Sequence, residues 1–251
     1  MEFINIAYVV GAICFILGIK MLSHPRTARR GNGIASFGML IAIVATLTAG
    51  EVLDFKMIGI AVLIGSVIGG IIAQRIEMTQ MPQMVAIFNG LGGGASALVA
   101  SAEFLSQYNQ YPSTFLLVTI ILSVSIGTLT LTGSFVAFGK LQGFISGKPI
   151  IFPLQQIFNA LVFISIFTLG YFILGNPLEL NLFYGILIAA AILGVTLTIP
   201  IGGADMPVVI SLLNSYSGIA AAATGFVLMN NALIISGALV GASGLILTQI
   251  M

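Results

Sequence analysis

Long runs of apolar residues, separated by short polar connections, recur along the whole chain. The hydrocarbon core of a bilayer is about 30 Å thick, so a helix needs about 20 mostly apolar residues to cross it. Nine segments come close to this length: Phe3–Leu22, Ile34–Ala49, Met57–Ala73, Pro82–Ala102, Thr114–Phe138, Pro153–Leu174, Leu182–Ile199, Pro207–Met229 and Ala232–Ile250. The pattern predicts an all-α fold, a polytopic membrane helix bundle of about nine transmembrane helices. We expect it to form one domain over residues 1–251.

Composition supports a surface that faces lipid. Hydrophobic residues make up 59% of the chain and charged residues only 6%, and the mean hydropathy is +1.17. A soluble domain carries about 25% charged residues, so this chain cannot cover its exterior with polar groups. The net charge of +1 also argues against nucleic acid as a partner.

Basic residues are concentrated in every second connection. The first, third and fifth connections contain Lys20, Arg26, Arg29, Arg30, Arg75, Lys140 and Lys148. The even-numbered connections contribute only Lys56, beside Glu51 and Asp54. Because positive residues stay on the cytoplasmic side, we expect the odd-numbered connections in the cytoplasm. The N-terminus is then outside, as the start of a retained helix, and the C-terminus is cytoplasmic.

A spaced pattern occurs twice at a separation of 125 residues. Met-Pro, an Asn seven positions after the Pro, and Gly-x-Ala four positions after that Asn run from Met81 to Ala95 and again from Met206 to Ala220. Each copy follows an odd-numbered connection and starts a predicted helix, so both copies run in the same direction. This favours a parallel internal repeat about an axis along the membrane normal.

Ionisable groups avoid the middle of the predicted helices. Every Asp, Glu, Lys and Arg lies in a connection or near a helix end, and the single histidine, His24, stands beside Pro25 in a basic connection. We interpret His24 as a solvated surface residue. A buried ionisable group in a membrane is by default functional, so we expect this chain to bury no titratable group and to hold no catalytic or metal-ligating residue.

Small and neutral polar residues line one face of four predicted helices. They are Ala86, Asn89, Gly90, Gly93, Ala97 and Ala100; Thr119, Ser123, Gly127, Thr130 and Ser134; Ser211, Asn214, Ser217, Gly218, Ala221 and Gly225; and Gly237, Gly241 and Gly244. Such stripes let helix backbones approach closely. Alternatively, several stripes surround a narrow hydrated path with Asn89 and Asn214 near its middle. Each Asn side chain brings two donors and an acceptor that need partners, which packing alone does not explain.

Two further patterns need an interpretation. Gly90 to Ala95 matches the dinucleotide-binding pattern G-x-G-x-x-A, but it lies inside an apolar helix with no preceding strand, so we reject a nucleotide site there. Asp205 directly precedes Met206 and Pro207 at a helix start. It is either an N-cap that complements the helix dipole or a cytoplasmic proton acceptor or contact for a soluble domain.

Specific blocks of the sequence resemble the beta subunit of proton-translocating NAD(P) transhydrogenase. These blocks are Gly202-Gly203-Ala204-Asp205-Met206-Pro207-Val208-Val209, Leu213-Asn214-Ser215-Tyr216-Ser217-Gly218, Gly237-Ala238-Leu239-Val240-Gly241-Ala242-Ser243-Gly244, Gly133-Ser134-Phe135-Val136-Ala137-Phe138-Gly139-Lys140-Leu141 and Glu77-Met78-Thr79-Gln80-Met81-Pro82. The resemblance covers essentially the whole chain.

The resemblance implies a function and an assembly. The family couples hydride transfer between NADH and NADP+ to proton movement across a membrane, here a bacterial cytoplasmic membrane. The chain then supplies a transmembrane proton-channel domain. The NADP(H)-binding domain that follows it in the family is expected beyond Met251, and NAD(H) binds to an alpha-type subunit that brings further membrane helices. The whole assembly is a homodimer, and no cofactor is expected on this chain itself.

The resemblance also implies site residues. Asn214, Ser134, Asp205 and Ser243 keep the family's residue types, whereas many relatives have a titratable histidine where this chain has Asn89. We therefore expect a proton path through Asn89, Asn214, Ser134, Ser217 and Ser243, with Asp205 at its cytoplasmic mouth. The titrating group is expected from a partner helix.

Two other functions fit the sequence taken without the resemblance. A secondary transporter would use a parallel repeat and helices rich in small residues, although the lack of mid-membrane charge argues against a charged substrate. A purely structural membrane anchor would use every stripe as a packing face.

Overall fold

The computed structural model of the protein describes residues 2–48, 54–107, 112–176 and 179–251. Nine α-helices in these ranges are long and apolar enough to cross a membrane, which confirms the predicted polytopic helix bundle. They are α1 (Glu2–Leu22), α2 (Pro25–Thr48), α3 (Phe55–Arg75), α4 (Met81–Ser106), α5 (Thr114–Leu141), α6 (Gln155–Gly175), α7 (Leu180–Thr198), α8 (Met206–Val227) and α9 (Asn231–Ile250). The protein is an integral membrane protein.

Most helix bounds lie within a few residues of the prediction, and α2 is the exception. It begins at Pro25, nine residues before the predicted start at Ile34, so Arg26, Arg29 and Arg30 of the predicted first connection lie in its opening turns, whereas Lys20 lies in the last turn of α1. A hydropathy pattern misses such turns because they are polar, yet Pro suits the first helical position and Arg favours helix. The predicted end at Ala49 and the nearby Glu51 lie outside the described residues.

The chain divides into two compact units, of which the first spans Met1–Met78. In this unit α1 and α2 form an antiparallel hairpin in which glycines bring the backbones together. A Cβ on Gly18 would lie 3.0 Å from the carbonyl oxygen of Gly31. The hydroxyls of Tyr8 and Thr46 are hydrogen-bonded at 3.0 Å. Helix α3 buries none of its residues, so its whole circumference is available to lipid or to other helices.

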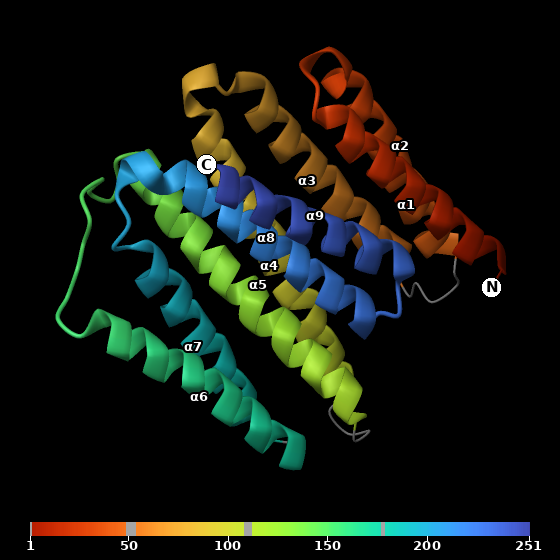
Figure 1. Cartoon of the computed structure of the whole chain (residues 1–251). Coiled ribbons are helices and arrows are strands. Elements are labelled where there is room, and N and C mark those ends of the chain that lie inside the picture. The colour runs from red at the N-terminus through yellow and green to blue at the C-terminus, as the bar shows by residue number, and fades with distance from the viewer. Residues whose placement is uncertain (1, 49–53, 108–111, 177–178) are drawn as a thin grey trace. The chain divides into compact units, whose positions relative to one another are not determined.

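The second unit spans Thr79–Met251 and contains α4 to α9. Helix α5 packs against α4, α6, α7 and α8, and α8 packs against α4, α5 and α9 (Figure 1). Contacts between α4 and α8 join Asn89 to Ser217 and Ser96 to Thr224, both at a separation of 128 residues. A constant separation means that α4 and α8 run parallel, as the repeat predicts.

The two repeat copies also start in the same way. A 3₁₀ turn precedes each helix, η1 (Met78–Gln80) before α4 and η2 (Gly203–Asp205) before α8. In each copy Met is the first helical residue and Pro the second. Each helix then packs antiparallel against the next one through the repeated glycine: Gly93 of α4 against α5, and Gly218 of α8 against α9.

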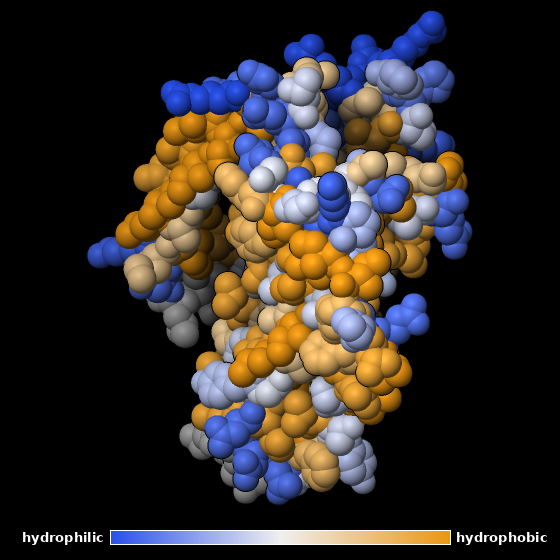
Figure 2. Space-filling view, turned by 90° about the vertical axis from the view of Figure 1, so that its left-hand side faces the viewer, coloured by the Kyte–Doolittle hydropathy of each residue, from blue (hydrophilic) through white to orange (hydrophobic). Residues whose placement is uncertain are grey.

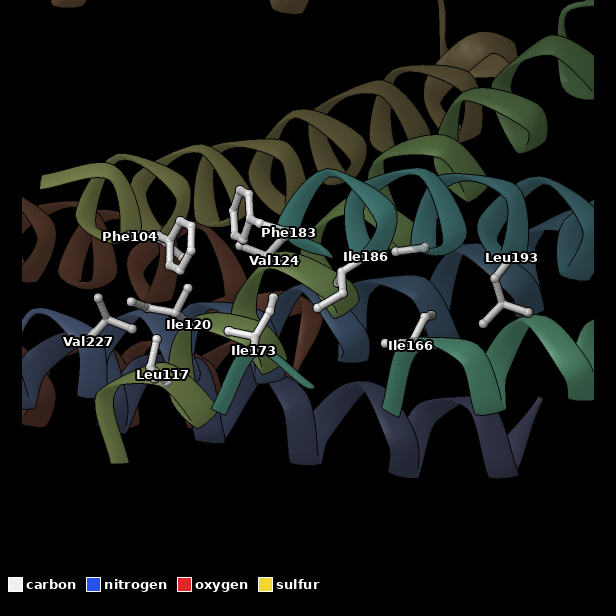
Figure 3. Packing of buried hydrophobic residues seen from close by; sticks show 12 residues of the cluster. Phe104, Leu117, Ile120, Val124, Ile166, Ile173, Phe183, Ile186, Leu193 and Val227 are labelled. Carbon is white, nitrogen blue, oxygen red and sulfur yellow. The ribbon is translucent and has the colours of Figure 1, made fainter. Parts of the chain in front are cut away.

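An apolar core lies where α5, α6 and α7 meet the ends of α4 and α8 (Figure 3). Its buried members are Ala100, Phe104, Leu117, Ile120, Val124, Ile166, Ile173, Phe183, Ile186, Ala190, Leu193 and Val227. The rings of Phe104 and Phe183 stack with their centroids 4.2 Å apart. This cluster, called the apolar core below, fixes α6 and α7 against α5.

Large apolar side chains also cover much of the outside. Phe163, Phe167 and Tyr171 of α6 are each more than half exposed. On the face that Figure 2 shows, apolar residues run along the helices and hydrophilic residues gather toward the two ends of the view. This is the distribution expected for helices whose sides contact lipid and whose ends reach water.

Candidate functional site

Three helices of the second unit meet at a hydrogen-bonded group of polar side chains. Asn89 of α4 donates from Nδ2 to Oγ of Ser134 on α5, at 2.9 Å. Ser217 of α8 donates from Oγ to Oδ1 of Asn89, at 2.8 Å. Asn89 is 8% exposed and Ser134 is fully buried. We call Asn89, Ser134 and Ser217 the polar node.

Small residues allow the polar node to form. A Cβ on Gly90 would lie 3.0 Å from Cβ of Ser134, so a larger residue there would push α5 away and separate Ser134 from Asn89. One turn further on, a Cβ on Gly93 would lie 2.9 Å from the carbonyl oxygen of Gly127. The glycine stripe of α4 therefore packs α4 on α5, and this packing brings the polar side chains within hydrogen-bond distance.

A second polar group lies on the same three helices, seven residues further along α4 and α8. The hydroxyls of Ser123 on α5 and Thr224 on α8 are 2.6 Å apart. Ser123 also approaches the backbone carbonyl oxygen of Ser96 on α4, at 3.3 Å. Seven helical residues correspond to about 10.5 Å along the axis. This Ser123–Thr224 cluster is buried.

The sequence analysis did not identify Ser96 or Thr224. The signal that could have found them is spacing: Ser96 follows Asn89 by seven positions, and Thr224 follows Ser217 by seven. Two helical turns return a residue to nearly the same face.

The structure places the other predicted path residues outside the polar node. Asn214 is partly exposed, and in the described part of the chain its amide makes no hydrogen bond. Its equivalent by the repeat, Asn89, finds a serine on the following helix, whereas α9 meets α8 through Gly237, Gly241 and Gly244. Ser243 lies on an exposed face of α9 and donates to its own helix, at the carbonyl of Val240 (3.1 Å).

The stripes on α8 and α9 serve mainly as packing faces. A Cβ on Gly218 would lie 2.7 Å from the carbonyl oxygen of Gly237. Ser211 donates to the carbonyl of Gly244 at 3.3 Å. Of the predicted α8 stripe, Ser217 is the residue that hydrogen-bonds to α4 in the described part of the chain.

Asp205 ends the η2 turn and is exposed. It occupies the N-cap position of α8, but its carboxylate makes no capping hydrogen bond. The N-cap position predicted for Asp205 is therefore confirmed, but its side chain makes no capping hydrogen bond, and the carboxylate is available to other groups at this end of the unit.

Lys140 contradicts the expectation that the chain buries no titratable group. It lies one residue before the end of α5 and is only 4% exposed. Its Nζ donates to the carbonyl oxygens of Lys148 (3.2 Å), Ile199 (2.5 Å) and Ile201 (2.7 Å). The position of Lys140 near a helix end is predicted correctly from the sequence, but no pattern in the sequence indicates that the chain folds back over its side chain.

The site has few groups that could hold a cofactor. Within the described ranges no three His, Cys, Asp or Glu residues gather as a metal site would require. The run from Gly90 to Ala95 lies inside α4, with Gly90, Gly93 and Gly94 packed against α5. The polar node itself offers only neutral donors and acceptors. It can orient protons and water, but it has no charged or titrating group of its own.

Comparison with known proteins finds one matching family and two similar curated proteins. The family model described as the NAD(P) transhydrogenase beta subunit matches residues 4–251. Two curated proteins of Rhodospirillum rubrum, one of them from strain ATCC 11170, are both named NAD(P) transhydrogenase subunit beta. Each is 45% identical over 251 residues, which cover 98% of this chain and 54% of the relative. The chain thus spans about half the length of these relatives.

Proposed function

Because the chain belongs to the NAD(P) transhydrogenase beta subunit family, we propose that it forms the proton-translocating membrane domain of that subunit. In the complete enzyme, hydride transfer from NADH to NADP+ is coupled to proton movement through this domain. The observation that carries the proposal is the polar node, a hydrogen-bonded group inside an apolar bundle where three helices meet.

The chemistry of the node suits conduction without titration. A hydroxyl donates one hydrogen bond and accepts others, and it can exchange these roles by rotating. An amide donates and accepts but takes up no proton near neutral pH. Protons therefore pass by way of water that replaces one of the direct bonds among Asn89, Ser134 and Ser217. The Ser123–Thr224 cluster extends this line of hydroxyls about 10.5 Å further along α4 and α8.

We assign the titrating group to a partner helix. The only charged side chain that the described helices bury is Lys140, and all three of its N–H donors are occupied by carbonyls. Asn214 and Ser243 have exposed surface on α8 and α9, so a partner helix that covers these faces would place its titrating group next to them. In this arrangement Asn214 holds water between the partner and the node.

The partners and cofactors follow from the family. The proposed assembly contains an alpha-type subunit with an NAD(H) domain and further membrane helices, an NADP(H) domain that follows this membrane domain, and a second copy of the whole. Both nucleotides bind to the soluble domains. Asp205, exposed beside α8, is the group that we propose as the contact or proton acceptor at the mouth facing the NADP(H) domain.

We place the domain in a bacterial cytoplasmic membrane with the starts of α4 and α8 on the cytoplasmic side. Lys148 lies at the same end of the second unit as Asp205, because backbone hydrogen bonds join their two connections. Basic residues favour the cytoplasm. Cysteines introduced at Lys148 and Ala204 should react with an impermeant maleimide only from the cytoplasmic side; reaction from the outside would reverse the orientation.

Asn214→Leu in the complete enzyme tests the function. The substitution removes the water contacts of the amide and adds no charge, so proton translocation in sealed vesicles should fall about tenfold or more, in the range that removal of one positioned polar group produces. Asn159→Leu is the matched control, since it makes the same change on α6, away from the node. Normal proton translocation by Asn214→Leu would show that this face of α8 is no part of the path.

A further inference from the structure

A buried ammonium group joins two connections at the end of the second unit where Asp205 lies. One is the α5–α6 connection, residues 142–154, and the other is the α7–α8 linker, residues 199–205. Lys140 donates to Lys148 in the first and to Ile199 and Ile201 in the second. Neither the family resemblance nor the proposed proton path assigns a role to Lys140.

The geometry satisfies the charged form of the side chain completely. A lysine ammonium has three N–H donors and no acceptor, and three carbonyl oxygens receive them. Ile199 is the C-cap of α7, so its carbonyl belongs to the end of a helix where backbone oxygens lack partners and a positive charge is favourable. A neutral apolar side chain here would leave the carbonyls of Lys148 and Ile201 without this donor.

Backbone hydrogen bonds join the same two segments on both sides of the ammonium. The N–H of Gly203 donates to the carbonyl of Gly147 at 2.8 Å, and the N–H of Ile150 donates to the carbonyl of Ile199 at 3.3 Å. The α7–α8 linker is therefore attached to the α5–α6 connection along its length. Lys140 is the only side chain in the described residues that donates to both segments.

The position of Lys140 in the chain connects the mouth to the polar node. Lys140 follows Ser134 by six residues on α5, which is about 9 Å along the helix axis. On the other side, Ile201 precedes Asp205 by four residues. A displacement of Asp205 and the linker therefore acts on the end of α5 through the ammonium, and α5 holds Ser134 against Asn89.

We propose that Lys140 is a positioning residue that transmits movements of the linker at Asp205 to α5 and so to the polar node. The inference rests on the proposed function, because it assigns Lys140 a part in coupling nucleotide-driven events at the mouth to proton passage. Its role is mechanical: the three hydrogen bonds of its ammonium group hold the two segments together.

Lys140→Met tests the proposal in the complete enzyme. Methionine keeps an unbranched apolar chain but removes all three donors. The number of protons moved per hydride transferred should fall about fivefold or more, the lower end of typical coupling between sites. Lys148→Met is the matched control, since it removes the same charge from an exposed side chain of the same connection and should leave the ratio unchanged. Lys140→Arg keeps the charge and several donors, so this variant should retain most of the normal ratio of protons moved to hydride transferred.

A second readout separates coupling from general damage. In Lys140→Met, a cysteine at Ala204, an exposed residue of η2, should react faster with a water-soluble maleimide because the linker is released. An equal loss of hydride transfer and proton movement, with the ratio and the labelling rate unchanged, overturns the proposal. If Lys140→Met does not assemble, Lys140→Gln, which keeps two donors, decides by the same ratio: an unchanged value overturns the proposal.

The measurements distinguish failure of the Lys140 proposal from failure of the proposed function. An unmodified enzyme that transfers hydride without moving protons would overturn the proposed function and this inference with it. An unmodified enzyme that pumps, together with a Lys140→Met enzyme that pumps equally well per hydride, overturns the inference about Lys140 alone.

Discussion

Helix α5 has two different neighbourhoods, and their comparison shows how this bundle separates stability from function. One face of α5 contributes Leu117, Ile120 and Val124 to the apolar core. Another contributes Ser134 to the polar node and Ser123 to the cluster with Thr224. The apolar face is satisfied by shape alone. The polar face requires particular partners at particular distances, because an unpaired polar group in a membrane costs several kcal/mol.

The two faces of α5 differ in the kinds of side chain that the neighbouring helices pack against them. At the apolar core, helices α6 and α7 meet α5 mainly with branched and aromatic side chains, which fill space. The one side-chain hydrogen bond between α5 and α7 in the described residues runs from Thr132 to the carbonyl oxygen of Ala191, at 3.0 Å. Helices α4 and α8 meet it through glycine, alanine and serine, so their backbones come close and short polar side chains reach across. We infer that the first face holds α5 in place while the second arranges protons and water around it.

The largest expected effect on stability comes from the apolar core. Phe183→Ala removes a fully buried ring that stacks on Phe104 and should destabilise the bundle by roughly 3 kcal/mol, the lower end of the range for Phe→Ala, since lipid removes the water-transfer part of that range. Thermal unfolding of the purified complex measures it. Protons moved per hydride should not change in the protein that remains folded.

The control for Phe183→Ala is Phe172→Ala, on the exposed side of α6, which should shift the unfolding temperature far less. If Phe183→Ala instead left stability intact and altered only the ratio of protons to hydride, the apolar face would share the function that we assign to the polar face.

Much of this architecture could be predicted from the sequence because lipid imposes simple rules. Helix number and most helix bounds follow from the length of apolar runs, and the parallel arrangement of α4 and α8 follows from the repeated Met-Pro and Asn. Asn89, Ser134 and Ser217, three of the residues predicted for the path, come together at one point.

Other features depend on neighbours that a single segment does not reveal. Asn89 and Asn214 are equivalent in the repeat, yet only Asn89 meets a serine, because the helix that follows each of them differs. The burial of Lys140 depends on two connections separated by more than 40 residues in sequence, Lys148 and Ile199 being its acceptors. The start of α2 was missed because its first turns are polar and lie beyond the apolar run.

The next effect in size concerns the polar face itself. Asn89→Leu removes the amide that Ser134 and Ser217 share, although Ser217 keeps the backbone carbonyl of residue 89 at 3.2 Å. The loss should cost about 1–3 kcal/mol and reduce proton translocation about tenfold or more. Asn89→His should be tolerated, because a neutral imidazole also offers one donor and one acceptor, the two roles that Asn89 fills here.

Proton translocation should be measured for both Asn89 variants in sealed vesicles. We expect Asn89→Leu to lose it and Asn89→His to retain it. Translocation that survives in Asn89→Leu would show that the node is only a packing contact, and the comparison between the two faces of α5 would then lose its functional meaning. Loss of translocation in both variants, with the complex intact, would show that the amide itself is required.

The smallest expected effect on stability, and the sharpest test at the mouth, is Asp205→Asn. Asp205 is exposed and its carboxylate makes no capping hydrogen bond, so Asp205→Asn should change the free energy of unfolding by no more than about 0.5 kcal/mol, as for most surface changes. Asn also serves as well as Asp at an N-cap, so any loss of function reports the missing charge. We expect proton-coupled hydride transfer to fall about fivefold or more, the lower end of coupling between sites, because the mouth loses its carboxylate. Unchanged coupling in Asp205→Asn would confine the functional part of the bundle to the polar face of α5 and its partners on α4 and α8.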